Sequence, residues 1–342
     1  MSLILGIEST CDETAAAVVR DGWDVRSNVI SSQVDLHAKY RGVVPEIASR
    51  AHIENILPVI RESLHSAACG FADIDAIAVA HRPGLVGSLL IGVTAAKTLA
   101  WTLGKPLVGV DHVQAHLYSL MLETNAPPQF PAVGLVCSGG HTALYVLQNW
   151  TDITLIGSTI DDAVGEAYDK VAAILGLGYP GGPILDRRAA IGNPKAVAFP
   201  RSRMGRESLD FSFSGLKTSV LYHVRGYQGR EHAIDLNEQE LNDIAASFQA
   251  ACVDVIIEKI RRAVAQTGGK SVIVGGGVSA NLGLRSAMTK RLNVPVFAPV
   301  LAYCTDNAAM SAGLADVMLK EERISGLDLD AITYSELKRI PR

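Results

Sequence analysis

The run Leu5-Gly-Ile-Glu-Ser-Thr-Cys-Asp-Glu-Thr-Ala-Ala-Ala-Val-Val19 has a counterpart later in the chain, Val133-Gly-Leu-Val-Cys-Ser-Gly-Gly-His-Thr-Ala-Leu-Tyr-Val-Leu147. The two runs align without a gap at an offset of 128 residues. Each has an apolar strand, a turn of small and polar residues, the pair Thr-Ala and a second apolar strand. This repeat predicts an α/β protein with two similar lobes, whose strand-end turns line a cleft. The alternative is the general likeness of any two α/β segments.

Strands and helices alternate around these runs. Short apolar segments predict strands, and longer periodic segments predict helices. In the first half we expect strands over 3–8, 15–20, 24–31, 75–80 and 106–110, and helices over 46–68, 85–103 and from 112 onward. Residues 271–274 and 296–299 correspond to the strands over 75–80 and 107–110. The predicted lobes span residues 1–125 and 126–342, with a C-terminal helix that can return to the first lobe.

The composition is typical of an enzyme with a large core. Hydrophobic residues make up 48% of the 342 positions, and 31 Lys and Arg nearly balance 35 Asp and Glu. This excludes disorder and a protein that coats nucleic acid through bulk positive charge. Glu8 follows the N-terminus too closely for a signal peptide, and Pro83–Ala96 is shorter than the roughly 20 residues that span a bilayer. Five cysteines without a CxxC pair indicate reduced thiols, so we expect a cytoplasmic protein.

Two histidines and an aspartate form a candidate metal site. His112-Val-Gln-Ala-His116 places two imidazoles on one helix face, where they can share an ion. Asp306 follows the strand that corresponds to the one before His112, and this donor set suits catalytic Fe(II) or Zn(II). The protease motif HExxH requires a glutamate where this chain has Val113, so that mechanism lacks its base. Two histidines on a helix surface are the alternative interpretation.

Two glycine-rich turns come directly after apolar strands, Val136-Cys-Ser-Gly-Gly-His-Thr142 and Val274-Gly-Gly-Gly-Val-Ser-Ala-Asn281. Glycines let backbone N–H groups approach a phosphate closely. Neither turn matches the P-loop or the dinucleotide-binding motif. We therefore expect a nucleotide between the two turns, with ordinary strand-to-helix turns as the alternative.

Carboxylates occur near these turns. Asp12 and Glu13 fall in the turn that matches Gly140-His141, so they should reach the same cleft from the other lobe. Asp169 is a candidate ligand for ribose hydroxyls, or else an exposed helix carboxylate. The pair Asp161 and Asp162 is explained by the helix dipole, which favours acidic residues at a helix N-terminus.

One segment is basic in an acidic chain. Between residues 186 and 217, seven Lys and Arg outnumber three Asp and Glu, a local charge of +4 against −4 for the chain. A solvated loop explains such a run, and a surface that steers a phosphate-bearing partner is the functional interpretation. The basic residues are Arg187, Arg188, Lys195, Arg201, Arg203, Arg206 and Lys217.

Eight motifs, in order across nearly the whole chain, resemble those of the bacterial tRNA N6-adenosine threonylcarbamoyltransferase family and its archaeal and eukaryotic Kae-type relatives. Ala308 after Asn307 and Cys137 before Ser138 replace a glycine and a valine that are as common in the family, and neither affects an expected role. The motifs are Glu8-Ser-Thr-Cys-Asp-Glu-Thr14, Gly42-Val-Val-Pro-Glu-Ile-Ala-Ser-Arg50, His112-Val-Gln-Ala-His116, Ser138-Gly-Gly-His-Thr142, Tyr179-Pro-Gly-Gly-Pro183, Asp210-Phe-Ser-Phe-Ser-Gly-Leu-Lys217, Gly275-Gly-Gly-Val-Ser-Ala-Asn281 and Cys304-Thr-Asp-Asn307.

The resemblance implies an actin/Hsp70/sugar-kinase type of fold, with duplicated lobes around a nucleotide cleft. It implies transfer of the threonylcarbamoyl group from threonylcarbamoyl-AMP to N6 of adenosine 37 in tRNA, next to the anticodon. The substrates would be tRNAs that read codons beginning with A, and the products t6A and AMP.

By motif position, the resemblance also implies three groups of site residues. The metal ligands would be His112, His116 and Asp306, with iron expected and zinc as the alternative. The reacting centre would use Asp12, Glu13 and His141, where one of the two carboxylates would accept the proton of the attacking amine. The nucleotide would be held by Val136, Cys137, Ser138, Gly139, Gly140, Asp169, Gly182, Asp186 and Asn281.

The implied partners are tRNA, a paralogous pseudo-enzyme subunit and a small P-loop ATPase, with no membrane. The helix from Glu46 onward, which carries Ala48, Ala51 and Ile53, is a candidate docking surface, with an ordinary core-facing helix as the alternative interpretation. A metal-dependent protease and a non-catalytic nucleotide-binding scaffold are the alternative functions. The missing HExxH glutamate argues against the first, and the intact metal triad argues against the second.

Overall fold

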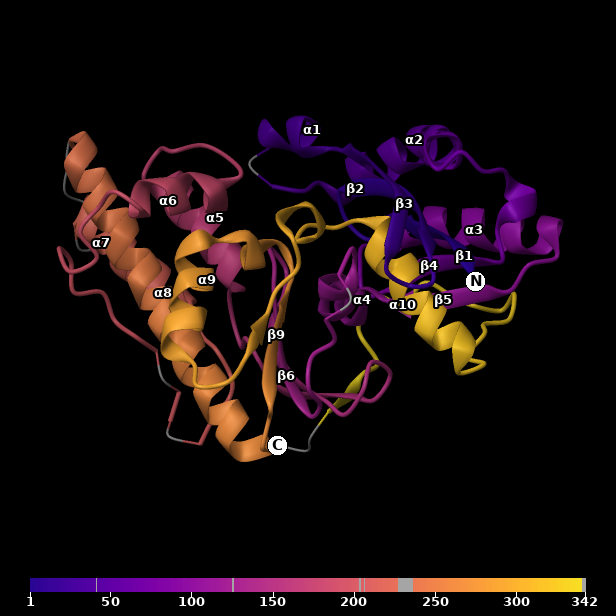
Figure 1. Cartoon of the computed structure of the whole chain (residues 1–342). Coiled ribbons are helices and arrows are strands. Elements are labelled where there is room, and N and C mark those ends of the chain that lie inside the picture. Colours follow the sequence, from indigo (N-terminus) through magenta and orange to yellow (C-terminus); the bar gives the residue numbers. More distant parts are fainter. Residues whose placement is uncertain (41, 125, 203, 206, 227–235, 340–342) are drawn as a thin grey trace. The chain divides into compact units, whose positions relative to one another are not determined.

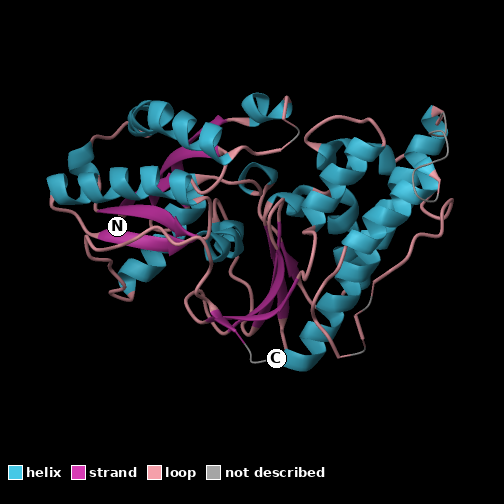
Figure 2. Cartoon of the chain, turned by 180° about the vertical axis from the view of Figure 1, so that it is seen from behind, coloured by secondary structure: helices cyan, strands magenta, loops and turns pink. Residues whose placement is uncertain are grey.

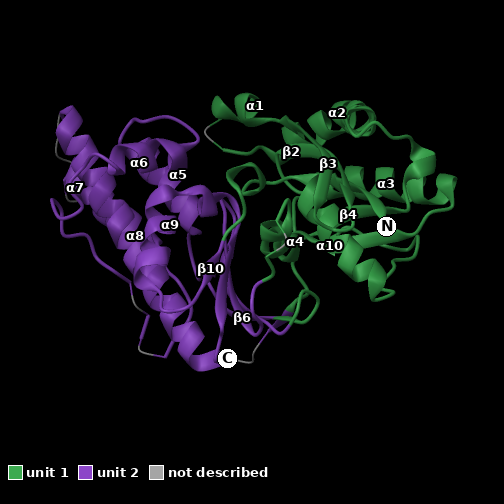
Figure 3. Ribbon diagram, in the orientation of Figure 1, with its two compact units in different colours: residues 1–127, 149–153, 298–337 green, residues 128–148, 154–297, 338–342 purple. Residues whose placement is uncertain are grey.

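Two β-sheets organise the computed structural model of the chain (Figure 1). The structure describes residues 1–40, 42–124, 126–202, 204–205, 207–226 and 236–339. The strand orders are β3-β2-β1-β4-β5 and β10-β9-β6-β7-β8-β11. The chain divides into two compact units, drawn in different colours in Figure 3. Unit 1 comprises residues 1–127, 149–153 and 298–337, and unit 2 comprises residues 128–148, 154–297 and 338–342.

In unit 1, helices cover both faces of the sheet (Figure 2). Its strands are β1 (Leu3–Glu8), β2 (Glu13–Arg20), β3 (Asp24–Ser32), β4 (Ala76–Arg82) and β5 (Leu107–Asp111). Its helices are α1 (Val34–Ala38), α2 (Pro45–Ser66), α3 (Val86–Leu103), α4 (His112–Tyr118) and α10 (Ala308–Lys320). Short 3₁₀ turns span Phe71–Asp73, Ser119–Met121 and Leu301–Tyr303.

The side chains of β1 explain why both faces are covered. Leu5 and Ile7 pack with α2 and α3, whereas Ile4 packs in the cluster that includes α10. Successive strand residues point to opposite faces, so an apolar strand such as β1 needs a helix on each. At Gly6, a Cβ atom would lie 2.9 Å from Cβ of Ala312 and would collide with the backbone of α10. The glycine therefore lets α10 lie directly on the sheet.

Unit 2 has a sheet and a group of helices built around α8 (Glu238–Thr267). Its other helices are α5 (Val164–Ile174), α6 (Gly181–Ala189), α7 (Ser214–Arg225) and α9 (Leu282–Arg291), with a 3₁₀ turn over Gly277–Ala280. Its strands are β6 (Ala132–Cys137), β7 (Thr142–Leu147), β8 (Ile153–Ser158), β9 (Ser271–Gly275), β10 (Val296–Phe297) and β11 (Lys338–Arg339). A capping box starts α8, because Asn237 and Glu240 each accept the other's backbone N–H.

The internal repeat is confirmed by strand direction and register. β2 is antiparallel and β4 parallel to β1, and β7 is antiparallel and β9 parallel to β6. Gly6 pairs with Ala17, and Gly134 pairs with Tyr145, which are the equivalent positions in the sequence repeat. The strands and helices expected in the first half are present, with ends that differ by one or two residues at most. The α/β fold class is therefore confirmed.

The predicted lobes 1–125 and 126–342 stay a prediction. The compact units differ from them, because residues 149–153 and 298–337 lie in unit 1. The second of these segments includes α10, which packs on β1 and β2. The return of a late helix to unit 1 places Asp306, at its start, in the same unit as α4.

α3 is the one helix of the described residues that is long and apolar enough to cross a membrane by length and composition. A core helix passes the same test, and Val93, Ala96 and Ala100 are buried in the core of unit 1. All five cysteines of the chain are free thiols.

Candidate functional site

α4 carries both histidines of the expected metal site. The helix begins directly after β5, and Asp111 caps it by accepting the N–H groups of Val113 at 3.0 Å and Gln114 at 3.2 Å. The four-residue spacing puts His112 and His116 on one helix face, with ring centroids 4.5 Å apart. The cap therefore holds two imidazoles in register at the end of a sheet strand.

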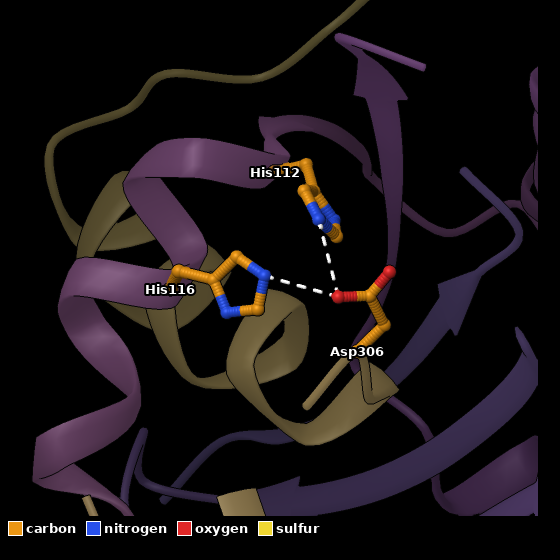
Figure 4. A group of neighbouring side chains, drawn as sticks. All are labelled: His112, His116 and Asp306. Atoms are coloured by element: carbon orange, nitrogen blue, oxygen red, sulfur yellow. Dashed lines mark hydrogen bonds and ion pairs between the residues drawn. The ribbon is translucent and has the colours of Figure 1, made fainter. Parts of the chain in front are cut away.

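Asp306 completes the group. It precedes Asn307, whose side chain caps α10 by accepting the N–H of Met310 at 3.1 Å. Its Oδ1 lies 3.1 Å from Nε2 of His116 and 3.5 Å from Nε2 of His112 (Figure 4). The two histidines are only 1% and 6% exposed, so the alternative interpretation as surface histidines is wrong.

Glu8, at the end of β1, supports the histidines from behind. Its Oε2 lies 3.1 Å from Nδ1 of His112, and its Oε1 accepts the N–H of Thr10 at 2.7 Å. This carboxylate is fully buried. Metal-bound histidines commonly donate their second ring N–H to such a carboxylate, which fixes the tautomer. The sequence pattern indicates no role for Glu8, although it stands in the same motif as Asp12 and Glu13.

The three side chains shift one another's pKa values through their charges. Burial alone would lower the pKa of His112, but the carboxylates of Glu8 and Asp306 outweigh it and hold that pKa well above its usual range. Burial and the neighbouring charge of His112 lower the pKa of His116. Burial would raise the pKa of Asp306, but the two histidines hold it well below its usual range. The two carboxylates thus favour the protonated form of His112, and the charge of His112 disfavours protonation of His116.

This donor set fits one divalent metal ion. One donor atom from each of the three residues lies within 4.8 Å of the other two. Two imidazole nitrogens and one carboxylate oxygen, with further positions open, suit a catalytic rather than a closed structural site. The outer contact from Glu8 leaves Nε2 of His112 available as the ligand atom.

Asp12 lies in the turn between β1 and β2, Glu13 is the first residue of β2, and His52 of α2 supports this turn. Nε2 of His52 is 3.0 Å from the carbonyl oxygen of Cys11, and Nδ1 is 2.8 Å from Oγ1 of Thr14. Burial lowers the pKa of His52. The neutral ring therefore donates to the carbonyl of Cys11 and accepts from the hydroxyl of Thr14. These two residues stand directly before Asp12 and directly after Glu13 in the sequence.

The turn offers bases suited to neutral pH. Ser32 donates to Oε1 of Glu13 at 2.8 Å, and Oε2 is buried without a hydrogen-bond partner in the described part of the chain. Burial raises the pKa of Glu13 to about 7 and also raises the pKa of Asp12. Burial and the Asp12 carboxylate raise the pKa of the Cys11 thiol, which stays protonated and is no nucleophile.

The two glycine-rich turns are neighbours in unit 2. β6 and β9 are parallel, with Val136 opposite Gly275, so both turns leave the same edge of the sheet. Gly276 has a φ of +85°, and a Cβ there would meet the carbonyl of Cys137, so only glycine fits. At Gly139 and Gly140 a Cβ would meet open space. The backbone of this first turn is therefore accessible to a ligand.

His141 lies in the same turn. Its N–H donates to Oγ of Ser138 at 3.1 Å, and its carbonyl accepts the N–H of Ser138 at 2.8 Å. His141 belongs to unit 2, whereas Asp12 and Glu13 belong to unit 1.

Asp169 and Gly182 meet at the start of α6. Oδ1 of Asp169 accepts the N–H of Gly181, the first residue of that helix, at 2.7 Å. Burial raises the pKa of this carboxyl, so the alternative of an exposed helix carboxylate is wrong. Beside it, a Cβ at Gly182 would meet open space. The pair forms an accessible helix start with a carboxylate next to it.

Asp186 and Asn281 both hold the start of α9. Oδ2 of Asp186 accepts the N–H of Leu282 at 2.9 Å. Oδ1 of Asn281 accepts the N–H of Leu284 at 2.7 Å, which makes it the N-cap. Asp186 of α6 and Asn281 of the second glycine-rich turn thus meet at the same helix start.

Asp161 and Asp162 contact α7 and α5 through their carboxylates. Asp161 accepts the hydroxyls of Ser212 and Ser214 at 2.6 and 2.7 Å and the N–H of Phe213 at 2.9 Å, so it binds the start of α7. Asp162 pairs with Lys217 of α7 at 2.8 Å and with Lys170 of α5 at 2.7 Å. The helix-dipole interpretation stays a prediction, and these carboxylates also join α7 to α5 and to the loop before it.

Three of the seven basic residues of the segment pair with carboxylates. Arg188 pairs with Glu238 at 2.7 Å, Arg201 with Asp254 at 3.1 Å, and Lys217 with Asp162. Arg203 and Arg206 lie outside the described residues. Arg187 and Lys195 are exposed. A steering role for this segment stays a prediction, with fewer available charges than the sequence count suggests.

The chain is similar to known proteins over nearly its whole length. A family model described as tRNA N6-adenosine threonylcarbamoyltransferase matches residues 24–313. The protein of that name from Geotalea uraniireducens (strain Rf4) is 49% identical over 343 residues, which covers 99% of this chain and 97% of that protein. The one from Moorella thermoacetica (strain ATCC 39073 / JCM 9320) is 49% identical over 334 residues, covering 96% and 95%.

Solved structures share the fold at low sequence identity. T. kodakarensis HypF aligns with a TM-score of 0.60 and 16% identity, covering 96% of this chain and 49% of that chain. Component A of (R)-2-hydroxyglutaryl-CoA dehydratase from Acidaminococcus fermentans aligns with a TM-score of 0.53 and 16% identity, covering 94% and 99%. At such identities the likeness concerns the fold alone.

Proposed function

Because this chain belongs to the tRNA N6-adenosine threonylcarbamoyltransferase family, we propose that it transfers a threonylcarbamoyl group from threonylcarbamoyl-AMP to N6 of adenosine 37 in tRNA. The acceptors are tRNAs that read codons beginning with A, and the product is t6A. The observation that carries the proposal is the convergence of His112, His116 and Asp306 in unit 1. Such a donor set with open positions fits carbonyl activation.

The transfer forms a bond from the adenine N6 to the carbamoyl carbon and breaks the bond from that carbon to the phosphate oxygen of AMP. His112, His116 and Asp306 would hold the metal, which we infer to be Fe(II), with Zn(II) as the alternative. A bound ion would act as a Lewis acid toward the carbamoyl oxygen. Glu8 fixes the ring of His112 through Nδ1.

The attacking amine must lose its proton during the transfer. Glu13 is the proposed acceptor, because a pKa of about 7 leaves the carboxylate deprotonated in part and basic enough near neutral pH. Asp12 is the second candidate, and its raised pKa has the same cause. His141 is the third polar group proposed for the reacting centre.

The adenylate is proposed to bind in unit 2. The accessible glycines of the first turn support this, because open backbone N–H groups can bind a phosphate. Asp169 and Asp186 would hold hydroxyls of the nucleotide, and Asn281 would contact it from the second turn. The proposed ligands are Val136, Cys137, Ser138, Gly139, Gly140, Asp169, Gly182, Asp186 and Asn281.

We propose that the enzyme acts in the cytoplasm with two protein partners, a paralogous pseudo-enzyme subunit and a small P-loop ATPase. The exposed apolar face of α2 and α3 is the proposed docking surface of the paralogous subunit. Ala48 and Ala51 of α2 are buried, but Ile53 and Leu57 are 60% and 55% exposed. Val86 and Leu90 are 52% and 45% exposed on α3, which packs against α2.

Replacing Ile53 and Leu57 by aspartate should abolish binding of the paralogous subunit at micromolar concentration, because two charges would be buried in an apolar interface. Size-exclusion chromatography and calorimetry measure the complex. The matched control is Ile191→Asp, which changes an aliphatic residue of unit 2 that is 71% exposed. Unchanged association of the double variant would place the interface elsewhere.

The function itself is tested by reconstitution. The purified chain, its two partners, threonylcarbamoyl-AMP and unmodified tRNA should yield t6A and AMP, detected by mass spectrometry of nucleosides and by nucleotide analysis. A tRNA with guanosine at position 37 is the control and should remain unmodified. Metal-dependent cleavage of a protein substrate, without transfer under any combination of partners, would overturn the proposal.

A further inference from the structure

Gln249 lies where four helices of unit 2 meet, and no sequence motif indicated that these helices are neighbours. It is a residue of α8 and is 8% exposed. α8 packs against α6 and α9, and α5 packs against α6 (Figure 1). The side chain of Gln249 contacts a polar group of α6, one of α5 and the N-cap residue of α9, which belongs to the second glycine-rich turn.

The amide of Gln249 uses both of its ends. Nε2 donates to Oδ1 of Asp186 on α6 at 2.9 Å. Oε1 accepts from Nδ2 of Asn281 at 2.7 Å and from the hydroxyl of Tyr168 on α5 at 3.2 Å. The carboxylate of Asp186 needs a hydrogen-bond donor, whereas Asn281 and Tyr168 need an acceptor. A side-chain amide meets both needs, because its nitrogen donates and its oxygen accepts.

The surrounding backbone is shaped for this amide. A Cβ at Gly283 would collide with Nε2 of Gln249. The first residues of α9 can therefore approach the amide only because position 283 is glycine. Close packing limits the rotation of this buried amide, so the orientation of Asp186 depends on that of Asn281.

We propose that Gln249 is a positioning residue that holds Asp186 and Asn281 in the orientation in which they meet the nucleotide. This inference rests on the proposed adenylate site in unit 2. Asp186 uses its other oxygen for the N–H of Leu282, and Asn281 uses its carbonyl oxygen for the N–H of Leu284. With one end of each side chain tied to α9 and the other to Gln249, neither side chain can turn without breaking a buried hydrogen bond.

Gln249→Glu is the most informative change, because it keeps the shape and replaces the donor with an acceptor. The introduced carboxylate would face the carboxylate of Asp186, and the two must separate. We expect the dissociation constant for AMP, measured by calorimetry on the full chain, to rise at least about 10-fold. The melting temperature is recorded in parallel to confirm that the protein folds.

A second substitution should restore the interaction. In the double variant Asp186→Asn with Gln249→Glu, the donor and the acceptor exchange places, so the bond between positions 186 and 249 can form again. The double variant should bind AMP more tightly than Gln249→Glu alone and within about 3-fold of Asp186→Asn alone. A merely structural role, in which any change at position 249 loosens the core, predicts additive losses instead.

Gln239→Glu is the matched control. Gln239 is exposed on the same helix and donates to the carboxylate of Asp243 at 2.8 Å, so the substitution creates the same pair of carboxylates at the surface. It should leave the affinity for AMP unchanged. Equal affinity of Gln249→Glu and the wild type, or additive losses in the double variant, would overturn the inference while leaving the proposed function intact. Absence of AMP binding by the wild type would overturn both.

Discussion

Replacing His116 with alanine is expected to lower metal affinity at least about 100-fold and to abolish threonylcarbamoyl transfer, while unit 1 stays folded. His116 supplies one of three converging donor atoms, through Nε2 at 3.1 Å from Asp306. Changes to outer partners of a metal ligand alone typically cost about 10–100-fold in affinity. Loss of a direct ligand should therefore cost more.

Elemental analysis after dialysis and anaerobic titration with Fe(II) measure this effect, with circular dichroism as the check on folding. His81→Ala is the control, since it also removes a buried imidazole of unit 1, one that pairs with the carbonyl of Asp330 and not with the metal group. Glu8→Gln should give an intermediate loss, of about 10–100-fold. Full metal content in His116→Ala would show that the metal is bound elsewhere.

The same titration should release protons. The pKa of His112 in the metal-free protein is well above its usual range, because Glu8 and Asp306 favour the imidazolium. A metal ion binds the neutral ring, so binding displaces that proton and the affinity rises with pH. Glu8→Gln removes one of the two carboxylates, so fewer protons should be released per bound metal ion at neutral pH.

Replacing Glu13 with glutamine is expected to lower the rate of transfer about 100- to 10,000-fold, the range for loss of a general base. Burial raises the pKa of Glu13 to about 7. Only the deprotonated form accepts the proton of the amine, so the rate of the wild type should rise with pH up to about that value. The variant lacks a titrating group at this position, and its residual rate should lack this rise.

Single-turnover kinetics across pH measure both effects, with AMP affinity and metal content as controls that should not change. Asp12→Asn is the matched variant in the same turn. If Asp12→Asn removes the pH-dependent rise and Glu13→Gln keeps it, Asp12 is the base and the assignment to Glu13 is wrong.

The fold was predictable because its pattern is local and appears twice. The apolar runs over 3–8 and 132–137 and the turns after them indicate the same supersecondary unit, and the registers confirm it. The spacing of His112 and His116 likewise predicts a shared helix face, which α4 shows. Such features depend on residues close in sequence, where backbone periodicity is decisive.

The partners of buried polar groups were not predictable in this way. Asp161 was interpreted from its position before a helix, but it binds the start of α7, some fifty residues later. Arg201 was counted as a free positive charge, but it pairs with Asp254 of α8. Neither partner follows from a local pattern, because each depends on which helices pack side by side.

By itself, the sequence determined the repeated strand-turn-strand unit, the helix that carries the two histidines and the types of donor at the metal site. Only the tertiary structure decided that Glu8 lies behind His112 and that Gln249 joins Asp186 to Asn281. The physical reason is that a strand or helix arises from short-range periodicity and hydrogen bonding along one segment. A buried carboxylate or amide instead takes the partner that packing brings within about 3 Å, and that partner can come from any part of the chain.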